Sequence, residues 1–189
     1  MNQSFNPFRI VILPGLGNSG SRHWQTHWQT HWGQAHPSWR RVEHQEWITP
    51  KAEDWIANLQ QALDESTMPT ILVAHSLACV LTARWALQHS GPVAGAFLVA
   101  PSDVDAPGFP EGTSGFKPMP MNRLPFPSML VASTNDFYAS EERSRAFAEA
   151  WGSELVVLGA RDHIGEAANL GMWPEGMALL ERFAAGLTK

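Results

Sequence analysis

The sequence TILVAHSLA, residues 70–78, decides the fold. After Thr70 the first part of it is apolar and rich in β-branched and leucine side chains, which is typical of a strand covered on both faces. The segment Leu77–Gln88 is predicted to be a helix, so Ser76 lies on a tight turn between strand and helix. A-H-S-L-A is a variant of the G-x-S-x-G nucleophile elbow, in which such a turn exposes the serine hydroxyl. Both small flanking residues are alanine here, where most elbows have glycine.

Short apolar segments before and after this motif predict the rest of a sheet. Together with Thr70–Ala74, the expected strands are Phe8–Leu13, Arg40–Glu46, Ala94–Ala100, Ser128–Ser133 and Glu154–Leu158. The other expected helices are residues 21–33, a helix starting at Pro50 after a Thr49 cap, Glu141–Trp151 capped by Ser140, and Pro174–Leu187. This alternation indicates a three-layer α/β/α fold with a central, mostly parallel six-stranded sheet. A chain of 189 residues accommodates it as one domain, residues 1–189, without a cap domain.

Composition excludes several classes of protein. The net charge is −5, which argues against nucleic-acid binding, and the single cysteine, Cys79, cannot form an internal disulfide. Residues 1–15 lack the basic region of a secretion signal, and no apolar segment approaches the roughly 20 residues that cross a bilayer. We therefore expect a cytoplasmic protein that binds neither membrane nor nucleic acid. Its oligomeric state is left open.

Two residues further along the chain complete a catalytic arrangement with Ser76. Asp136 follows the fifth expected strand and His163 follows the sixth. The carboxyl ends of parallel strands meet at one edge of a sheet, so we expect the three side chains to lie together. The order serine, acid, histidine is the one found in folds with a nucleophile elbow. The sequence thus predicts a triad in which Asp136 orients His163 and His163 deprotonates Ser76.

Other interpretations of these residues remain open. On the pentapeptide alone, Ser76 is as well explained as a helix cap. Asp103 and Asp105 follow the fourth expected strand, which is an alternative position for the acid, although we favour the loop of Asp136. Asp162 is interpreted as a surface charge. His75 is expected to be buried and hydrogen-bonded, pointing away from the substrate.

The loop after the first expected strand supplies a second feature of the site. In hydrolytic elbows the oxyanion is bound by two backbone N–H groups, here expected from Leu77 and Leu16. Gly15 allows this loop to approach a ligand closely. Gly15, Gly17 and Gly20 also match the spacing of a dinucleotide-binding loop. That match is weak because tryptophan and histidine dominate the next segment and no acidic residue clearly ends the second strand.

Residues 101–127 form a long connection with seven prolines and no helical or strand periodicity. Loops of this length in a compact domain are usually functional. We expect this loop to form part of an acyl pocket or a flap. The residues expected to contact substrate are Gly15, Trp24, Phe116 and Met119.

A repeat of four residues runs from His23 to Trp32. On a helix it places one stripe of histidines beside one stripe of tryptophans, namely His23, His27 and His31 beside Trp24, Trp28 and Trp32. Histidines at i and i+4 can bind a divalent metal. We favour the interpretation that the tryptophans pack the helix on the sheet and the histidines face solvent, and we predict no metal site.

Several motifs together resemble those of the small serine hydrolases related to retinoblastoma-binding protein 9 and bacterial YdeN, a branch of the α/β-hydrolase superfamily. They are P-G-L-G-N-S (14–19), H-W-Q (23–25), A-H-S-L-A-C (74–79), L-P-F-P-S (124–128), A-S-T-N-D-F-Y (132–138), W-G (151–152), G-A-R-D-H-I-G (159–165) and W-P-E-G (173–176). The resemblance implies a triad at Ser76, Asp136 and His163. The family usually has glycine where this chain has Ala78 and Asp162.

These observations predict a serine hydrolase of ester, thioester or small amide bonds that forms an acyl-enzyme on Ser76. Its expected partner is a small-molecule ester or amide, and no cofactor is needed. The alternative is a protein-interaction module on a hydrolase fold with a weak or vestigial triad, since fold does not imply function. A metal site on the histidine repeat is a third, weaker alternative.

Overall fold

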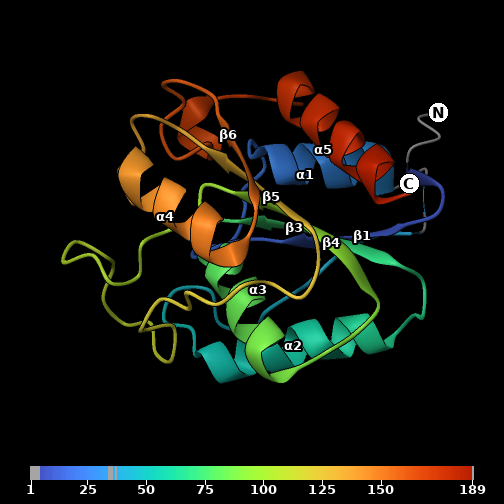
Figure 1. Cartoon of the computed structure of the whole chain (residues 1–189), viewed down its shortest axis with the longest axis horizontal. Helices are drawn as coiled ribbons and strands as arrows, with labels where there is room; N and C mark the ends of the chain where they lie inside the picture. Colours follow the sequence, from blue (N-terminus) through green and yellow to red (C-terminus); the bar gives the residue numbers. More distant parts are fainter. Residues whose placement is uncertain (1–4, 34–35, 37, 189) are drawn as a thin grey trace.

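Six parallel strands form one sheet at the centre of the fold, in the order β2-β1-β3-β4-β5-β6 (Figure 1). They are seen in a computed structural model that describes residues 5–33, 36 and 38–188. The strands are β1 (Arg9–Leu13), β2 (Trp39–Arg41), β3 (Thr70–His75), β4 (Val93–Val99), β5 (Ser128–Ala132) and β6 (Glu154–Val157). The larger helices are α1 (Trp24–Trp28), α2 (Ala52–Asp64), α3 (Leu77–Gln88), α4 (Glu141–Trp151) and α5 (Pro174–Leu187).

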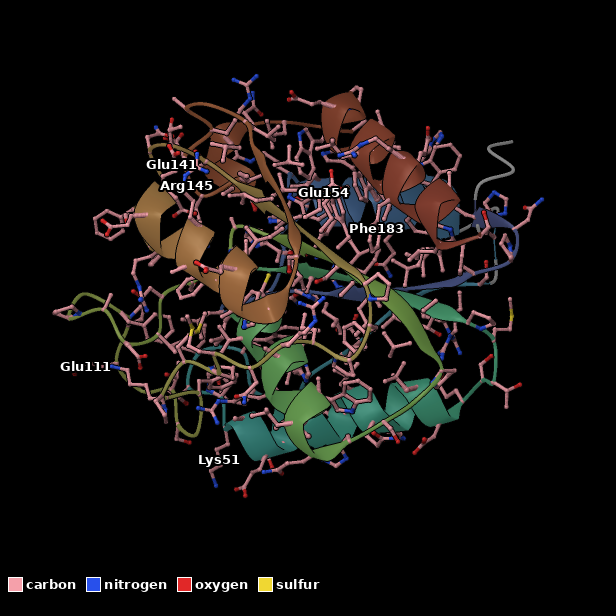
Figure 2. All side chains as sticks on the ribbon, viewed as in Figure 1. Lys51, Glu111, Glu141, Arg145, Glu154 and Phe183 are labelled. Carbon is pink, nitrogen blue, oxygen red and sulfur yellow. The ribbon has the colours of Figure 1, made fainter. Side chains whose placement is uncertain are left out.

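Helices cover both faces of the sheet. Alternate residues of a strand point to opposite faces, so Leu72 and Ala74 of β3 join one core cluster while Ile71 and Val73 join another. The first cluster includes side chains of α2, α3 and α4, and the second includes those of α1 and α5. Side chains fill both layers, with Phe183 of α5 directed at the sheet (Figure 2). The predicted three-layer α/β fold is confirmed.

The predicted extent of one strand and the predicted start of one helix are wrong, because contacts with neighbouring segments set both. The predicted strand Arg40–Glu46 is the shorter β2. The last hydrogen bond between this segment and β1 runs from the Val42 amide to the Ile12 carbonyl at 3.0 Å. The pairing goes no further because β1 itself ends at Leu13. Helix α2 begins at Ala52 rather than at Pro50, because the Pro50 carbonyl accepts a hydrogen bond from Ser114 of the long loop instead.

The four-residue repeat forms a mixed helix rather than a uniform one. Helix α1 is followed by a π-helical segment, η2 (Gln29–Gly33). Because an α-helical turn takes 3.6 residues, side chains spaced four apart shift gradually around the helix. The wider π-helical turn, with its i→i+5 hydrogen bonds, compensates for this shift. Trp24 and Trp28 are buried against the sheet, as the packing interpretation predicts.

The long connection between β4 and β5 has no helix or strand and is held by side chains of the helices. Arg84 of α3 donates from Nε to the Phe116 carbonyl at 2.9 Å, and Trp151 of α4 donates from Nε1 to the Pro120 carbonyl at 2.7 Å. These bonds fix the loop against the face covered by α2, α3 and α4. None of the helices in the described part of the chain has both the length and the apolar character to cross a membrane.

Candidate active site

Ser76 occupies a strained turn between β3 and α3. Its backbone has φ 59° and ψ −125°, a region that non-glycine residues adopt only when the surrounding structure holds them there. Its amide donates to the Val99 carbonyl at 3.0 Å, which ties the turn to β4. The Ser76 side chain makes no capping hydrogen bond to α3. Its hydroxyl is therefore available for other partners, and the helix-cap interpretation is wrong.

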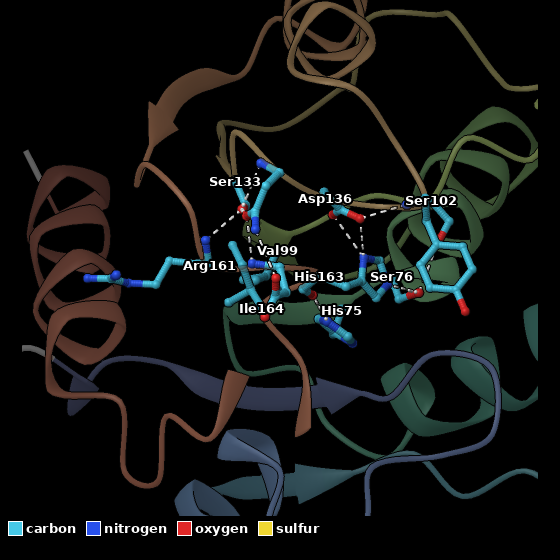
Figure 3. A network of polar contacts seen from close by, with 12 residues as sticks. His75, Ser76, Val99, Ser102, Ser133, Asp136, Arg161, His163 and Ile164 are labelled. Atoms are coloured by element: carbon cyan, nitrogen blue, oxygen red, sulfur yellow. Dashed lines mark hydrogen bonds and ion pairs between the residues drawn. The ribbon is translucent and has the colours of Figure 1, made fainter. Parts of the chain in front are cut away.

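The imidazole of His163 bridges Ser76 and Asp136 (Figure 3). His163 Nε2 lies 2.8 Å from Ser76 Oγ, and His163 Nδ1 lies 2.9 and 2.8 Å from the two Asp136 carboxylate oxygens. The Asp136 side chain is 3% exposed and that of His163 is 18% exposed. A buried carboxylate on one ring nitrogen and a hydroxyl on the other is the arrangement by which a histidine activates a serine.

The alternative acids have partners elsewhere. Asp103 is held by Arg143, whose Nε and Nη2 lie 2.7 and 3.2 Å from the carboxylate. Asp105 accepts from the Met119 amide at 3.0 Å. Asp162 accepts from the Asn135 side chain at 2.9 Å. None of these three carboxylates is a hydrogen-bond partner of His163 in the described structure.

The loop that carries His163 is fixed from several directions. Ser133 Oγ, at the end of β5, accepts from the Arg161 amide at 2.9 Å. The Ile164 carbonyl accepts from Trp24 Nε1 at 2.8 Å. His75 Nε2 lies 2.9 Å from the His163 carbonyl, so the residue before the nucleophile anchors the main chain of the base. The predicted burial and hydrogen bonding of His75 are both seen, but the expectation that it points away from the substrate is wrong, because His75 lines the same cavity as Ser76.

The loop after β1 passes directly over the nucleophile. A Cβ atom on Gly15 would lie 2.7 Å from Ser76 Cβ and 2.9 Å from the His75 carbonyl oxygen, so only glycine fits without displacement. The next residue, Leu16, lines the same cavity as Ser76. Leu77 is the first residue of α3, so its amide has no acceptor within the helix. The loop does not enter a helix directly, unlike a dinucleotide-binding loop, because α1 begins only at Trp24.

A cavity of about 550 Å³ opens above Ser76 and His163. Its apolar lining consists of Leu16, Phe109, Pro110, Phe137, Tyr138 and Ala167. Its other lining residues are Asn18, His23, His75, Ser76, Ser102, Asn135, Asp162, His163, Gly165 and Glu166. The cavity thus has both apolar and polar lining residues, of which Asp162 and Glu166 are acidic.

None of the four residues that the sequence places in the substrate pocket lines this cavity, and Gly15 instead packs against Ser76. Trp24 is buried beneath it, where its indole packs on Trp28 and Trp173. Phe116 is also buried and packs edge-on against Trp55 of α2, with ring centroids 5.6 Å apart. Met119 is 5% exposed within the same core cluster. Apolar character in a long loop does not distinguish a residue that faces a ligand from one that anchors the loop.

Comparisons with known proteins identify the family of this chain. The family model described as serine hydrolase matches residues 10–182. The chain belongs to the serine hydrolase family. A YdeN-like hydrolase of Pectobacterium atrosepticum is similar in structure, with a TM-score of 0.84 and 30% identity over 98% of this chain and 95% of that one. This chain is therefore a hydrolase of the α/β-hydrolase superfamily, as the sequence motifs indicate.

More distant structures share the fold. The ydeN gene product of Bacillus subtilis aligns with a TM-score of 0.77 and 19% identity, over 92% of this chain and 97% of that one. Esterase 2 of Thermogutta terrifontis aligns with a TM-score of 0.67 and 17% identity, over 94% of this chain and 82% of that one. None of the curated proteins compared with the chain matches it.

Two further histidines of this serine hydrolase lie close to the triad and also line the cavity. The ring centroid of His75 is 4.9 Å from that of His163 and 4.7 Å from that of His23. Burial lowers the pKa of His23 to about 3, with smaller contributions from Arg41 and neighbouring histidines. Burial also lowers the pKa of His75 well below its usual value, and His23 and His163 add to the effect. Both imidazoles are therefore neutral at neutral pH.

Sequence reasoning missed several residues around the nucleophile. Phe109 and Ser102 lie in the loop after β4, while Phe137 and Tyr138 follow Asp136 directly. All four come from loops at the carboxyl ends of strands, which is where sites in open α/β sheets form. That position is the one sequence signal that singles them out.

The histidine repeat does not act as a unit in the fold. His23 is the N-cap of α1, where its Nδ1 accepts from the Gln25 amide at 3.1 Å and its ring is buried. His27 is half-buried and His31 is exposed on η2. The prediction that all three histidines face solvent is thus wrong for His23.

Proposed function

We propose that this hydrolase cleaves ester, thioester or small amide bonds through an acyl-enzyme formed on Ser76. The observation that carries the proposal is the bridging position of His163, with its two ring nitrogens within 2.9 Å of Ser76 and Asp136. The carboxylate holds a proton on Nδ1, which leaves Nε2 unprotonated and able to accept the proton of Ser76.

The reaction then follows from this arrangement. His163 Nε2 takes the hydroxyl proton as Ser76 Oγ attacks the substrate carbonyl carbon. The N–H groups of Leu16 and Leu77 are proposed to bind the resulting oxyanion. His163 then gives its proton to the leaving group as the bond to the carbonyl carbon breaks. Water, deprotonated by the same nitrogen, attacks the acyl-enzyme and releases the acid and free Ser76.

The surroundings of Ser76 favour a small, neutral substrate. Loops supply most of the lining of the cavity of about 550 Å³, and no arginine or lysine of the described chain lines it. The apolar side chains Phe109, Phe137 and Tyr138 are suited to an acyl or aryl group of modest size. Hydrolase and esterase relatives support a small-molecule substrate. We also propose that residues 1–189 form one hydrolase domain.

Turnover of p-nitrophenyl esters with acyl chains of increasing length tests the proposal. We expect the wild type to hydrolyse the shorter esters, and Ser76→Ala and His163→Ala to lose at least about 10³-fold in kcat/KM. Ser140→Ala is a control, because it removes the α4 cap, where Ser140 Oγ accepts from the Arg143 amide at 3.2 Å, and leaves the site intact.

Two outcomes would contradict this function. Equal turnover by wild type and Ser76→Ala would show that the serine is not the nucleophile. A folded wild type that neither turns over esters nor reacts with a fluorophosphonate would instead support an interaction module with a vestigial triad.

A further inference from the structure

Ser76 has a second hydroxyl partner that the triad does not use. Ser102 Oγ lies 2.9 Å from Ser76 Oγ, in the loop that follows β4 (Figure 3). Ser102 is 2% exposed and lines the base of the cavity. Within the described structure its side chain has no other hydrogen-bond partner. The Ser102 hydroxyl therefore hydrogen-bonds to the nucleophile alone within the described structure.

The direction of this hydrogen bond follows from counting protons. A serine hydroxyl has one proton to donate and two lone pairs that accept. Asp136 fixes the His163 proton on Nδ1, so Nε2 is an acceptor and must receive the single proton of Ser76. Ser76 has no proton left for Ser102. The hydroxyl of Ser102 is accordingly the donor, and Ser76 Oγ is the acceptor.

We propose, on the basis of the function proposed above, that Ser102 is a further catalytic residue that stabilises negative charge on Ser76 Oγ. During attack the Ser76 proton moves to His163 Nε2 while the Oγ–carbon bond forms, and Ser102 donates to the oxygen as charge develops on it. During deacylation the Oγ–carbon bond breaks, Oγ keeps the electron pair, and His163 returns a proton to it. Ser102 keeps its own proton throughout both steps.

Such a donor strengthens when its acceptor becomes charged. A hydrogen bond to a charged group contributes more than one to a neutral hydroxyl. The donor is buried and fixed before the reaction, so it needs no reorganisation as the charge appears. Ser102 thus contributes more to the transition states than to the resting enzyme, which is the condition for accelerating the reaction.

The fold contains a second pair of hydrogen-bonded serines, one buried and one half-buried, that makes a control. Ser128, at the start of β5, lies with its Oγ 2.7 Å from that of Ser153, which directly precedes β6. This pair is at the amino ends of the strands, at the opposite edge of the sheet from Ser76. Ser128→Ala and Ser102→Ala therefore remove the same kind of bond, one far from the reaction and one on the nucleophile.

The test compares Ser102→Ala, Ser102→Cys and Ser128→Ala with wild type, using ester turnover and the rate constant for fluorophosphonate labelling. We expect Ser102→Ala to lose roughly 10- to 100-fold in both rates. Ser102→Cys fills the site with a slightly larger side chain and has only a weak donor, so it should lose about 10-fold or more. Ser128→Ala should stay within about 2-fold of wild type. A structural defect would lower the fraction of protein that labels and leave the rate constant of the folded fraction unchanged.

Ser102→Ala with a labelling rate constant within about 3-fold of wild type would overturn the proposal. Should Ser102→Ala fail to fold, a fully active Ser102→Cys would overturn it equally. In either case an active wild type and an inactive Ser76→Ala would leave the triad function standing. A wild type without turnover or labelling would refute the triad function itself.

Discussion

Acidification should destabilise the protein through His23, the buried residue that caps α1. Burial lowers the pKa of His23 from 6.5 to about 3, so the folded state keeps this imidazole neutral. The unfolded chain binds a proton at His23 once the pH falls below about 6.5. The contribution of His23 to the free energy of unfolding is therefore constant above that pH. It falls as the pH drops below about 6.5 and stops falling near the folded-state pKa.

The size of the effect follows from the same shift. Each pH unit between the two pKa values changes the free energy of unfolding by about 1.4 kcal/mol. At pH 5 the pH lies about 1.5 units below the unfolded-state pKa of 6.5 and still above the folded-state value. His23 alone then removes about 2 kcal/mol of stability relative to neutral pH. For a chain of this length that equals a fall in Tm of about 4–8 °C.

The assay is urea unfolding at pH 7.5 and pH 5 for wild type and His23→Asn. Asparagine is a good N-cap and can replace the acceptor that His23 offers to the Gln25 amide, but it does not titrate. We expect the variant to lose about 2 kcal/mol less than wild type between the two pH values. His44, whose pKa is also lowered, remains in both proteins and cancels in the comparison. His75 also remains, and because burial is the largest cause of its lowered pKa, most of its contribution cancels as well. Equal acid losses in the two proteins would refute the reasoning.

Two further substitutions test the site. Gly15→Ala should lower kcat/KM by about 10²-fold, because its Cβ would lie 2.7 Å from Ser76 Cβ and displace loop or nucleophile. Gly186→Ala is the control, because an added Cβ there would lie in open space on α5; it should leave turnover unchanged and raise Tm slightly. Equal activity of the two variants would contradict the close approach of Gly15 to Ser76. Asp136→Asn should lower kcat by roughly 10³- to 10⁴-fold, because it removes the carboxylate that orients His163. Asp103→Asn only weakens the contact with Arg143, so it should keep most of the activity. The reverse order in ester turnover would identify Asp103 as the acid.

The sequence predicts the sheet and the triad geometry well because both follow from local patterns. Buried parallel strands appear as apolar runs, and helices α3, α4 and α5 have the predicted bounds. Once the strands are in register, Ser76, Asp136 and His163 must meet at their carboxyl ends. The Ser140 cap of α4 is equally local, and its side chain accepts from the Arg143 amide as predicted.

Features that depend on distant partners were not predictable in this way. The length of β2 depends on where β1 turns away, and the start of α2 depends on Ser114 of the long loop. The prediction of the substrate-contacting residues is wrong for the same reason. Phe116 packs against Trp55, whereas Phe109 of the same loop lines the cavity. The hydrogen bond between Ser102 and Ser76 joins residues whose neighbouring strands, β4 and β3, must first be paired.

Site-resolved labelling with a fluorophosphonate is the most direct test of the central claim. The account predicts one covalent adduct on the native protein, located by peptide mass spectrometry on Ser76. Labelling should be abolished in Ser76→Ala and strongly slowed in His163→Ala, because His163 Nε2 accepts the proton of the attacking hydroxyl. An adduct on any other residue, or an equal labelling rate in Ser76→Ala, would contradict the account.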